Sequence, residues 1–337
     1  MSKEHDNVSP LPANQILLGG QAVIEGVMMR GPGSIATAVR RKDGSITVHK
    51  EPFVPLALRK RFWNIPVFRG IAGFFEMLSI GIRMLNFSAT IAMQDIGPDG
   101  GTDHASPARS KKNERIGTAA AFFVSLVFAV GLFFILPLVL TTSLFDVAQQ
   151  PLAFNLLAGA IRLGIFLGYL AAIARIPDVN RLFMYHGAEH MTVFAYERLR
   201  SVSVEAARVQ SRFHPRCGTS FLLIVVVASI VVFAFADALI LASVGTITLP
   251  LRMLWHVLLL PLIAGTSYEV IRFSARHTGT ALGRIIIAPG LLLQRLTTRA
   301  PSDEQLEVAV VALRAALELN EAPGGEAAKM GVDAKYA

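Results

Sequence analysis

Two histidines and a glutamate lie within five residues, in the run His186-Gly187-Ala188-Glu189-His190. At about 100° per residue on a helix, Glu189 lies about 60° to one side of His186 and His190 about 40° to the other, so the three side chains share one face. This is the inverted zincin pattern, in which two histidines bind zinc and the glutamate activates a water molecule. The run therefore predicts a divalent-metal site, most simply a zinc site, with Glu189 as the general base.

A catalytic zinc site needs a third protein ligand, and the sequence offers three candidates. His214 and Cys217 lie in the run His-Pro-Arg-Cys, and their spacing lets both side chains turn toward one ion. Glu269 follows Tyr268 near the end of an apolar segment, where an unpaired carboxylate is costly. Glu197 lies on the histidine face about two turns further along the helix, but pairing with nearby arginines is its simpler role.

These residues also have a structural interpretation. If His186, His190, His214 and Cys217 all bind one ion, the site is closed and activates no water. Taken singly, an interfacial histidine, a small buried cysteine and a membrane-edge glutamate paired with an arginine are all ordinary features of proteins. Because independent arguments bring them to one membrane face, a metal site is favoured over separate roles.

The composition predicts a membrane protein. The chain has 337 residues, of which 53% are hydrophobic and 17% are charged. Its apolar segments reach the length of about 20 residues that crosses a bilayer. We therefore predict an all-α polytopic membrane protein with about four transmembrane helices. The predicted spans are 117–144, 152–174, 219–243 and 249–271.

The distribution of basic residues predicts the orientation of these spans. The loops at 145–151 and 244–250 contain no lysine or arginine, whereas arginines crowd the segment 175–216 and follow the last span. By the positive-inside rule, both termini and the loop at 175–218 face the cytoplasm across the cytoplasmic membrane. The net charge of +8 is then explained by topology and by attraction to anionic lipid headgroups, rather than by a specific nucleic-acid partner.

The N-terminal part predicts a small cytoplasmic β unit. Moderate alternation of apolar and polar residues at 34–41 and 45–51 flanks Asp43-Gly44, a strong β-hairpin signal. The glycine-rich run at 18–32 precedes it, and its glycines would let the backbone approach another surface closely. We expect this unit to form a cap over the polar site at the membrane interface.

The segment 62–96 is apolar but spaces Arg69, Glu76 and Arg83 seven residues apart. This spacing predicts an interfacial amphipathic helix, with a fifth span or a re-entrant segment as the alternative. The other predicted segments are a disordered N-terminus (1–15), the glycine-rich segment and hairpin (16–61), a linker (97–115), the transmembrane domain (116–300), a C-terminal amphipathic helix (301–320) that follows the cap residue Ser302, and a disordered tail (321–337).

The polar residues inside the predicted spans include Arg162, Asp237 and His256. Charged side chains at membrane depth are expensive and should face the interior of the bundle. We expect Arg162 to pair structurally with Asp237 or with a backbone carbonyl. A transporter pathway through these residues is a weaker alternative, because no inverted repeat is apparent.

Four longer runs resemble the YqhQ-like family of bacterial membrane proteins, a family of unknown function described as predicted metal-dependent enzymes. The runs are Gly-Gly-Gln-Ala-Val-Ile-Glu-Gly-Val-Met-Met-Arg-Gly at 19–31, Tyr-His-Gly-Ala-Glu-His at 185–190, His-Pro-Arg-Cys-Gly-Thr-Ser-Phe at 214–221 and Tyr-Glu at 268–269. The resemblance implies that Gln21, Glu25 and Arg30 act together with the histidine, cysteine and glutamate residues named above.

These observations lead to a working hypothesis of metal-dependent hydrolysis at the cytoplasmic face of the membrane. His186 and His190 would bind zinc with Glu269 or His214 as the third ligand, Glu189 would be the general base, and Arg30 or Arg216 would stabilise a developing oxyanion. The substrate would be a peptide or a lipid-linked amide or ester. The alternative is a non-catalytic factor for membrane-protein assembly or for an envelope complex, which uses the cluster as a clamp.

Overall fold

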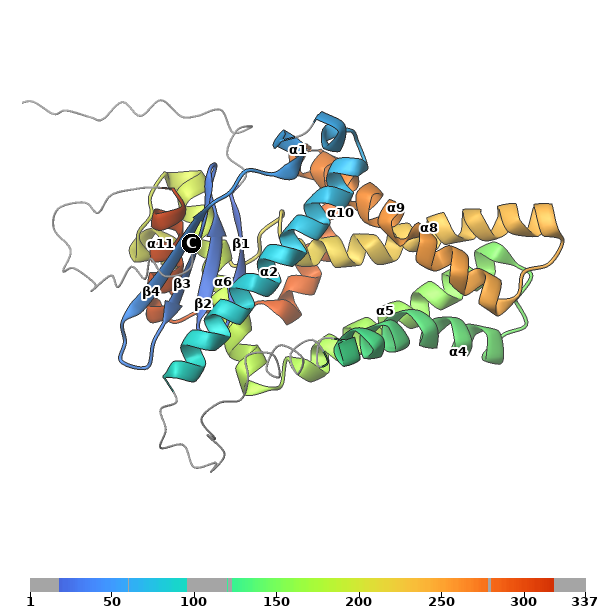
Figure 1. Ribbon diagram of the computed structural model, residues 1–337, viewed down its shortest axis with the longest axis horizontal. Helices are drawn as coiled ribbons and strands as arrows, with labels where there is room; N and C mark the ends of the chain where they lie inside the picture. The colour runs from blue at the N-terminus through green and yellow to red at the C-terminus, as the bar shows by residue number, and fades with distance from the viewer. Residues whose placement is uncertain (1–17, 60, 96–119, 121–122, 278–279, 318–337) are drawn as a thin grey trace, which may run out of the picture.

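The computed structural model describes residues 18–59, 61–95, 120, 123–277 and 280–317. A β-sheet with helices packed on it forms one end of the molecule, and long apolar helices extend from it to the other end (Figure 1). The predicted disordered termini and the predicted linker at 97–115 lie outside the described residues. The molecule is mostly helical, with a small N-terminal sheet, as the sequence predicts.

The sheet has four antiparallel strands in sequential order. The predicted hairpin is confirmed as β3 (Ser34–Arg40) and β4 (Ile46–Pro52), with Gly44 at a φ of 84° in the turn. The glycine-rich run forms a second hairpin, β1 (Gly19–Val23) and β2 (Gly26–Arg30), which the sequence analysis did not predict. Its two-residue turn places Glu25 at a φ of 53°.

Three helices cover one face of the sheet. They are α6 (Pro177–Leu199), α7 (Val204–Arg208) and α11 (Asp303–Ala316), and they share an apolar core with the side chains of β1 to β3. The predicted C-terminal amphipathic helix is confirmed as α11. It begins at a capping box between Ser302 and Gln305, which satisfies backbone donors that the first turn would otherwise leave unpaired.

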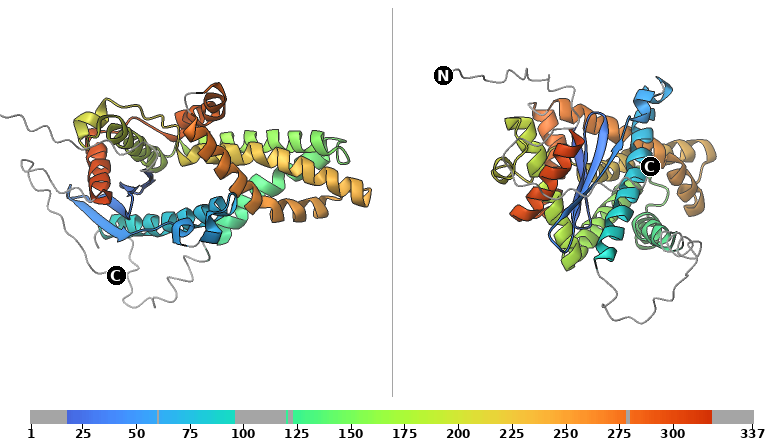
Figure 2. Two further views of the ribbon diagram at one scale, coloured as in Figure 1. Left: turned by 90° about the horizontal axis from the view of Figure 1, so that it is seen from above. Right: turned by 60° about the vertical axis from the view of Figure 1, so that its left-hand side comes forward.

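The opposite face of the sheet is covered by α2 (Phe68–Gln94), so that the sheet lies between two helical layers (Figure 2). Ile80, Met84 and Ile91 of this helix pack against the apolar side chains of β1 to β3. Two short elements precede α2, namely α1 (Leu56–Arg59) and the 3₁₀ turn η1 (Arg61–Asn64).

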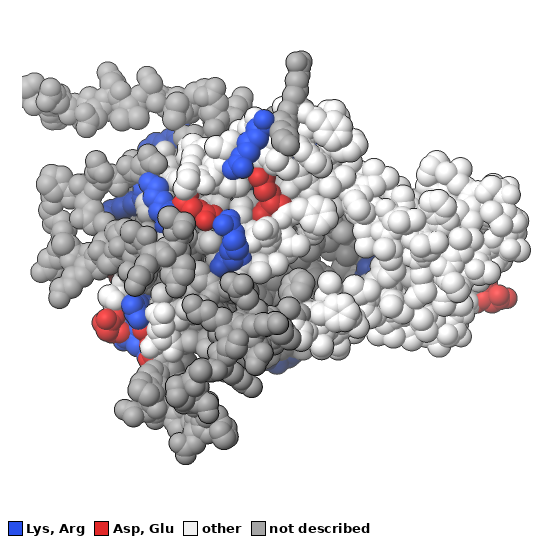
Figure 3. All heavy atoms as spheres, in the orientation of Figure 1, with Lys and Arg blue, Asp and Glu red and all other residues white. Residues whose placement is uncertain are grey.

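Five helices in the described part of the chain are long and apolar enough to cross a membrane. They are α2, the helix Phe123–Leu144, α5 (Pro151–Ile173), α8 (Gly218–Val244) and α9 (Leu249–Arg276). The last four correspond to the four predicted spans. On the face drawn in Figure 3, charged side chains gather over the sheet end, and the far end of the long helices is largely uncharged.

One of these helices contains a π turn. In Phe123–Leu144, the turn η2 (Gly131–Ile135) is followed by α4 (Leu136–Leu144). A π turn interrupts the regular hydrogen bonding of the helix. Arg162 of α5 donates a hydrogen bond of 3.0 Å to the carbonyl oxygen of Phe133 within this turn, so the structure gives it a carbonyl partner, as the sequence analysis expects.

After α9, the chain turns back as α10 (Ala281–Thr297), which packs against α8 and leads to α11. A Cβ added to Gly290 of α10 would lie 2.2 Å from the Ser220 hydroxyl of α8, so glycine is needed for this close approach. The contact brings the end of α10 beside the beginning of α8, where the residues of the candidate site lie.

Candidate metal centre

His186, His190 and Cys217 come together in the structure. One ligand atom from each residue lies within 4.8 Å of the corresponding atom of the other two. His186 Nε2 lies 3.2 Å from Cys217 Sγ, and the two imidazole ring centroids are 4.4 Å apart. Two nitrogens and one sulfur form a donor set that suits zinc and related divalent metals.

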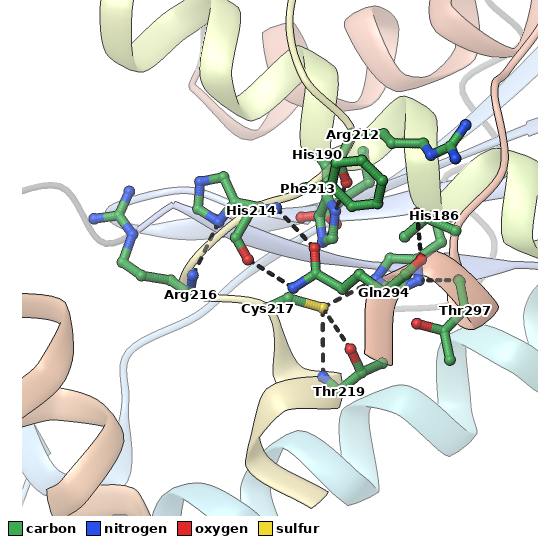
Figure 4. Close-up of polar contacts among 12 residues, drawn as sticks. His186, His190, Arg212, Phe213, His214, Arg216, Cys217, Thr219, Gln294 and Thr297 are labelled. Carbon is green, nitrogen blue, oxygen red and sulfur yellow. Dashed lines mark hydrogen bonds and ion pairs between the residues drawn. The ribbon is translucent and has the colours of Figure 1, made fainter. Parts of the chain in front are cut away.

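Both histidine rings are held in place through their other nitrogen (Figure 4). His186 Nδ1 lies 2.7 Å from the Thr297 carbonyl oxygen, and His190 Nδ1 lies 2.5 Å from the Arg212 carbonyl oxygen. Because a carbonyl only accepts, each Nδ1 must carry the proton, which leaves the Nε2 lone pair free. Carbonyls in this position are the usual outer partners of metal-binding histidines.

His190 has an unused ring nitrogen. Its side chain is 1% exposed, and its Nε2 atom has no hydrogen-bond partner among the described residues. Burial lowers the pKa of the His190 imidazole, so the neutral form is favoured. A buried lone pair without a partner is unfavourable in a folded protein unless a ligand uses it.

Cys217 is the N-cap residue of α8 and is buried. Its sulfur accepts a hydrogen bond from the Thr219 backbone N–H at 3.4 Å and lies 3.1 Å from the Thr219 hydroxyl oxygen. The sulfur thus lies at the positive end of the α8 dipole, beside the histidines. The thiolate is the form of cysteine that binds metals.

Glu189 completes the polar group on α6. Its side chain is almost fully buried, and a carboxylate oxygen lies 3.5 Å from His190 Nε2. Burial raises the pKa of the Glu189 carboxyl, while the nearby His186 and His214 rings and the Gly20 backbone N–H act in the opposite direction. The glutamate borders a cavity of about 70 Å³ together with the triad of His186, His190 and Cys217. That volume is enough for a water molecule or a small ligand group beside an ion.

Two glycines allow the backbone to approach this group. A Cβ on Gly20 of β1 would lie 2.7 Å from Glu189 Cγ, so only glycine lets the strand lie directly over the carboxylate. A Cβ on Gly187 would lie 2.1 Å from the Arg299 carbonyl oxygen, so α6 also lies close to the segment that carries Thr297. The close approach expected from the glycine-rich run is therefore made to the predicted site.

Comparisons with known proteins identify the family. Residues 65–319 match the family described as protein of unknown function DUF1385. The chain belongs to this family. It is also 34% identical over 304 residues to the uncharacterized protein YqhQ of Bacillus subtilis (strain 168), a match that covers 89% of this chain and 92% of that protein. The resemblance to YqhQ-like proteins is thereby confirmed. No solved structure matches the chain.

Three further residues predicted for the site of this DUF1385 protein lie beside the triad. The ring of His214 is 5.6 Å from that of His190, but its Nδ1 accepts a hydrogen bond from the Arg216 backbone N–H at 3.3 Å and its Nε2 lies 3.4 Å from a Glu197 oxygen. The Arg216 guanidinium forms an ion pair with Glu197. Burial lowers the pKa of the His214 imidazole. His214 and Arg216 line the cavity, whereas Glu197 lies behind them.

Five other predicted residues lie outside this group. Glu269 forms an ion pair with Arg69 of α2 and not with the histidines, and its neighbour Tyr268 packs against Gly70 of the same helix. Glu25 pairs with Arg181. The remaining two, Gln21 and Arg30, contact α2 on the far face of the sheet, at Gly81 and Met77 respectively.

The structure adds residues that the sequence analysis did not name. Gln294 of α10 is fully buried, accepts a hydrogen bond from the His214 backbone N–H and donates one to the His214 carbonyl oxygen, both at 2.8 Å. Its polar side chain among the apolar residues of α10 was a signal that could have found it. Thr297 and Arg212 act through backbone carbonyls, so their residue types gave no such signal.

Proposed function

We propose that this chain is a zinc-dependent hydrolase of the cytoplasmic membrane, with its site at the cytoplasmic membrane face. The observation that carries the proposal is the arrangement of His186, His190 and Cys217. Both histidines are oriented through Nδ1, their Nε2 atoms lie close to the Cys217 sulfur, and that sulfur lies at the start of α8. Two imidazole nitrogens and one sulfur are donor types that zinc binds.

A zinc ion in this position would supply Lewis-acid chemistry and lower the pKa of water. The protein residues would supply the proton transfers. Glu189 borders the cavity beside the triad, and its raised pKa makes it a stronger base than an exposed glutamate. Arg216 also borders the cavity and would stabilise negative charge that develops on a substrate oxygen. Arg30, the other arginine predicted for this role, lies on the far face of the sheet near Met77.

The number of protein ligands favours an enzyme over the alternative of a structural clamp in an assembly factor. A closed structural zinc site usually has four protein ligands, whereas a catalytic site keeps one position open. His214 would be the fourth ligand, but both of its ring nitrogens already contact other groups. The cavity beside the triad leaves room for a substrate group.

We also propose that the four helices from Phe123–Leu144 to α9 cross the membrane and that α2 lies at its cytoplasmic interface. Charge bias supports the orientation, because arginines gather in the segments at the sheet end. The packing of Ile80, Met84 and Ile91 on the sheet supports the interfacial position of α2, since the C-terminal part of the helix covers a sheet that we place in the cytoplasm.

The first experiment is metal analysis by mass spectrometry on the full chain purified in detergent. We expect about one zinc ion per chain in the wild type and none in the His186→Ala/His190→Ala double variant. The double variant His49→Ala/His277→Ala is the matched control, because it removes two histidines that lie outside the site. A well-folded wild type without metal would contradict the proposal.

A second comparison separates catalysis from metal binding. Glu189→Gln should retain zinc but lose hydrolysis of internally quenched peptides or of a lipid-linked ester, because glutamine cannot accept the proton. Equal activity in Glu189→Gln and wild type would exclude Glu189 as the base. Loss of folding in this conservative variant would instead favour the structural clamp.

A further inference from the structure

In the described part of the chain, no other strand covers the outer edge of β1. It is the first strand of the sheet and pairs only with β2. The two-residue turn makes Val23 and Gly26 a hydrogen-bonded pair. Hydrogen-bonded pairs alternate with non-hydrogen-bonded pairs along two antiparallel strands, so Gln21 and Met28 form the next hydrogen-bonded pair. The backbone groups of the intervening residues, Gly20 and Ala22, therefore point away from β2 toward the open edge.

This edge passes directly over the candidate metal centre. The Gly20 N–H interacts with the Glu189 carboxylate. The next outward groups are the Gly20 carbonyl and the Ala22 N–H and carbonyl, and these have no hydrogen-bond partner among the described residues. Both residues are partly exposed. Unpaired backbone groups along a strand edge form a template for another extended chain.

The cavity borders the start of this strand, at Leu18, Gly19 and Gly20. The helix α6 contacts β1 from one side, through Glu189, and α2 contacts it from the other, through Gly81. Ser88 of α2 accepts a hydrogen bond from the N–H of Ile24, the residue after the strand. In Figure 1, β1 is the strand nearest the long helices, so its edge faces the region where the cavity lies. A Cβ on Gly19, which borders the cavity, would contact no atom within 4 Å. A glycine in a strand without a packing reason often marks the close approach of a ligand or another backbone.

We propose that the substrate is an extended peptide segment that adds to the sheet along the outer edge of β1. This inference rests on the proposed hydrolase function and specifies its substrate class. The peptide would pair with the Gly20 carbonyl and with both backbone groups of Ala22. The Gly20 N–H already interacts with Glu189, so the hydrogen bonds to the peptide would end there. A peptide carbonyl would then lie beside the triad.

The corresponding reaction is hydrolysis of a peptide bond. Water adds its oxygen to the carbonyl carbon while Glu189 accepts one of its protons. The bond between carbon and nitrogen then breaks, and Glu189 returns the proton to the leaving nitrogen. The products are a carboxylic acid and an amine, and no oxidant or reductant is needed.

The test uses hydroxamates, which bind zinc at open coordination positions, on the zinc-loaded full chain in detergent. Calorimetry compares a tetra-alanine hydroxamate with acetohydroxamate. Two or three strand hydrogen bonds predict that the peptide hydroxamate binds about tenfold more tightly or better. The Ala22→Pro variant, which removes the outward N–H, should lose this advantage and keep its zinc and its affinity for acetohydroxamate.

A second measurement needs no variant. Methylation of one backbone nitrogen of the peptide hydroxamate should abolish its advantage, whereas methylation of the next nitrogen should not, because alternate groups face the strand. Equal sensitivity at both positions, or equal affinity of the two unmethylated hydroxamates, would overturn the peptide inference and leave the metal centre standing. Absence of bound zinc would instead contradict the proposed function itself.

Discussion

Two buried polar clusters that contain histidine lie in the described part of the chain, and they differ in whether a shared charged partner lies at their centre. In the bundle of long helices, Asp237 accepts hydrogen bonds from Arg252 at 2.8 Å and Asn155 at 2.7 Å and lies 3.1 Å from His256 Nε2. The His256 ring is stacked on Phe233, with 3.7 Å between ring centroids. Asp237 thus provides a common partner for the polar groups around it.

The cluster on α6 has the opposite character. Its histidines are fixed by backbone carbonyls through Nδ1, and their Nε2 atoms converge on a thiol beside a cavity. Buried histidine is therefore a poor indicator of function on its own. Donor atoms that converge on one point, with a cavity beside them, distinguish the candidate site from the polar network in the bundle.

The largest effect should come from breaking the bundle network. Asp237→Ala leaves Arg252 and His256 without their shared acceptor, and loss of one partner of a buried ion pair costs about 3–5 kcal/mol. We expect a corresponding loss of unfolding free energy in detergent, with unchanged zinc per folded chain. If Asp237→Ala lost zinc at full stability, the two clusters would not be independent.

The second-largest effect tests whether β1 must lie close to Glu189. Gly20→Ala would place a methyl group 2.5 Å from the Met28 carbonyl oxygen and 2.7 Å from Glu189 Cγ. Overpacking of this kind costs about 1–3 kcal/mol, and here it displaces the proposed base. We expect hydrolysis to fall by about 10- to 100-fold with zinc retained.

Gly33→Ala is the control for this variant, because a Cβ there contacts nothing within 4 Å and Gly33 lies outside the site. Full activity of Gly20→Ala would show that Glu189 tolerates displacement and would weaken its assignment as the base.

The third effect concerns Gln294, which clamps the backbone of His214. The His214 carbonyl also accepts a hydrogen bond from the backbone N–H of the ligand Cys217, so Gln294→Ala should misplace the thiol and weaken zinc binding by about tenfold. Competition with a zinc-binding dye on the purified protein measures the change.

Gln149→Ala is a matched control at the other end of the molecule. Gln149 makes the same two hydrogen bonds to the backbone of Ile247, both at 3.1 Å. It should affect stability similarly and leave zinc affinity unchanged. A similar loss of zinc affinity in both variants would mean that general destabilisation, and not the position of Gln294, is responsible.

Local sequence signals predicted much of this structure. The four apolar segments, the Asp43-Gly44 hairpin and the cap at Ser302 were all recognisable because their signals lie within a few residues. The spacing of His186 and His190 likewise fixed their common face. What could not be predicted was pairing between distant segments. The carbonyls of Arg212 and Thr297 orient the histidines whatever their side chains are, and Arg69 lies 200 residues from Glu269, its partner in the fold.

The smallest effect on zinc affinity should come from substitution of His214. This measurement decides how many protein ligands the site has. Both ring nitrogens of His214 contact groups other than the triad, so His214→Gln should change zinc affinity by less than about tenfold. His186→Gln, which removes a member of the triad, is the comparison and should lose much more. If the two variants lost zinc equally, His214 would rotate to become a fourth ligand when metal binds. The site would then be closed, and a structural clamp would be favoured over a catalytic site.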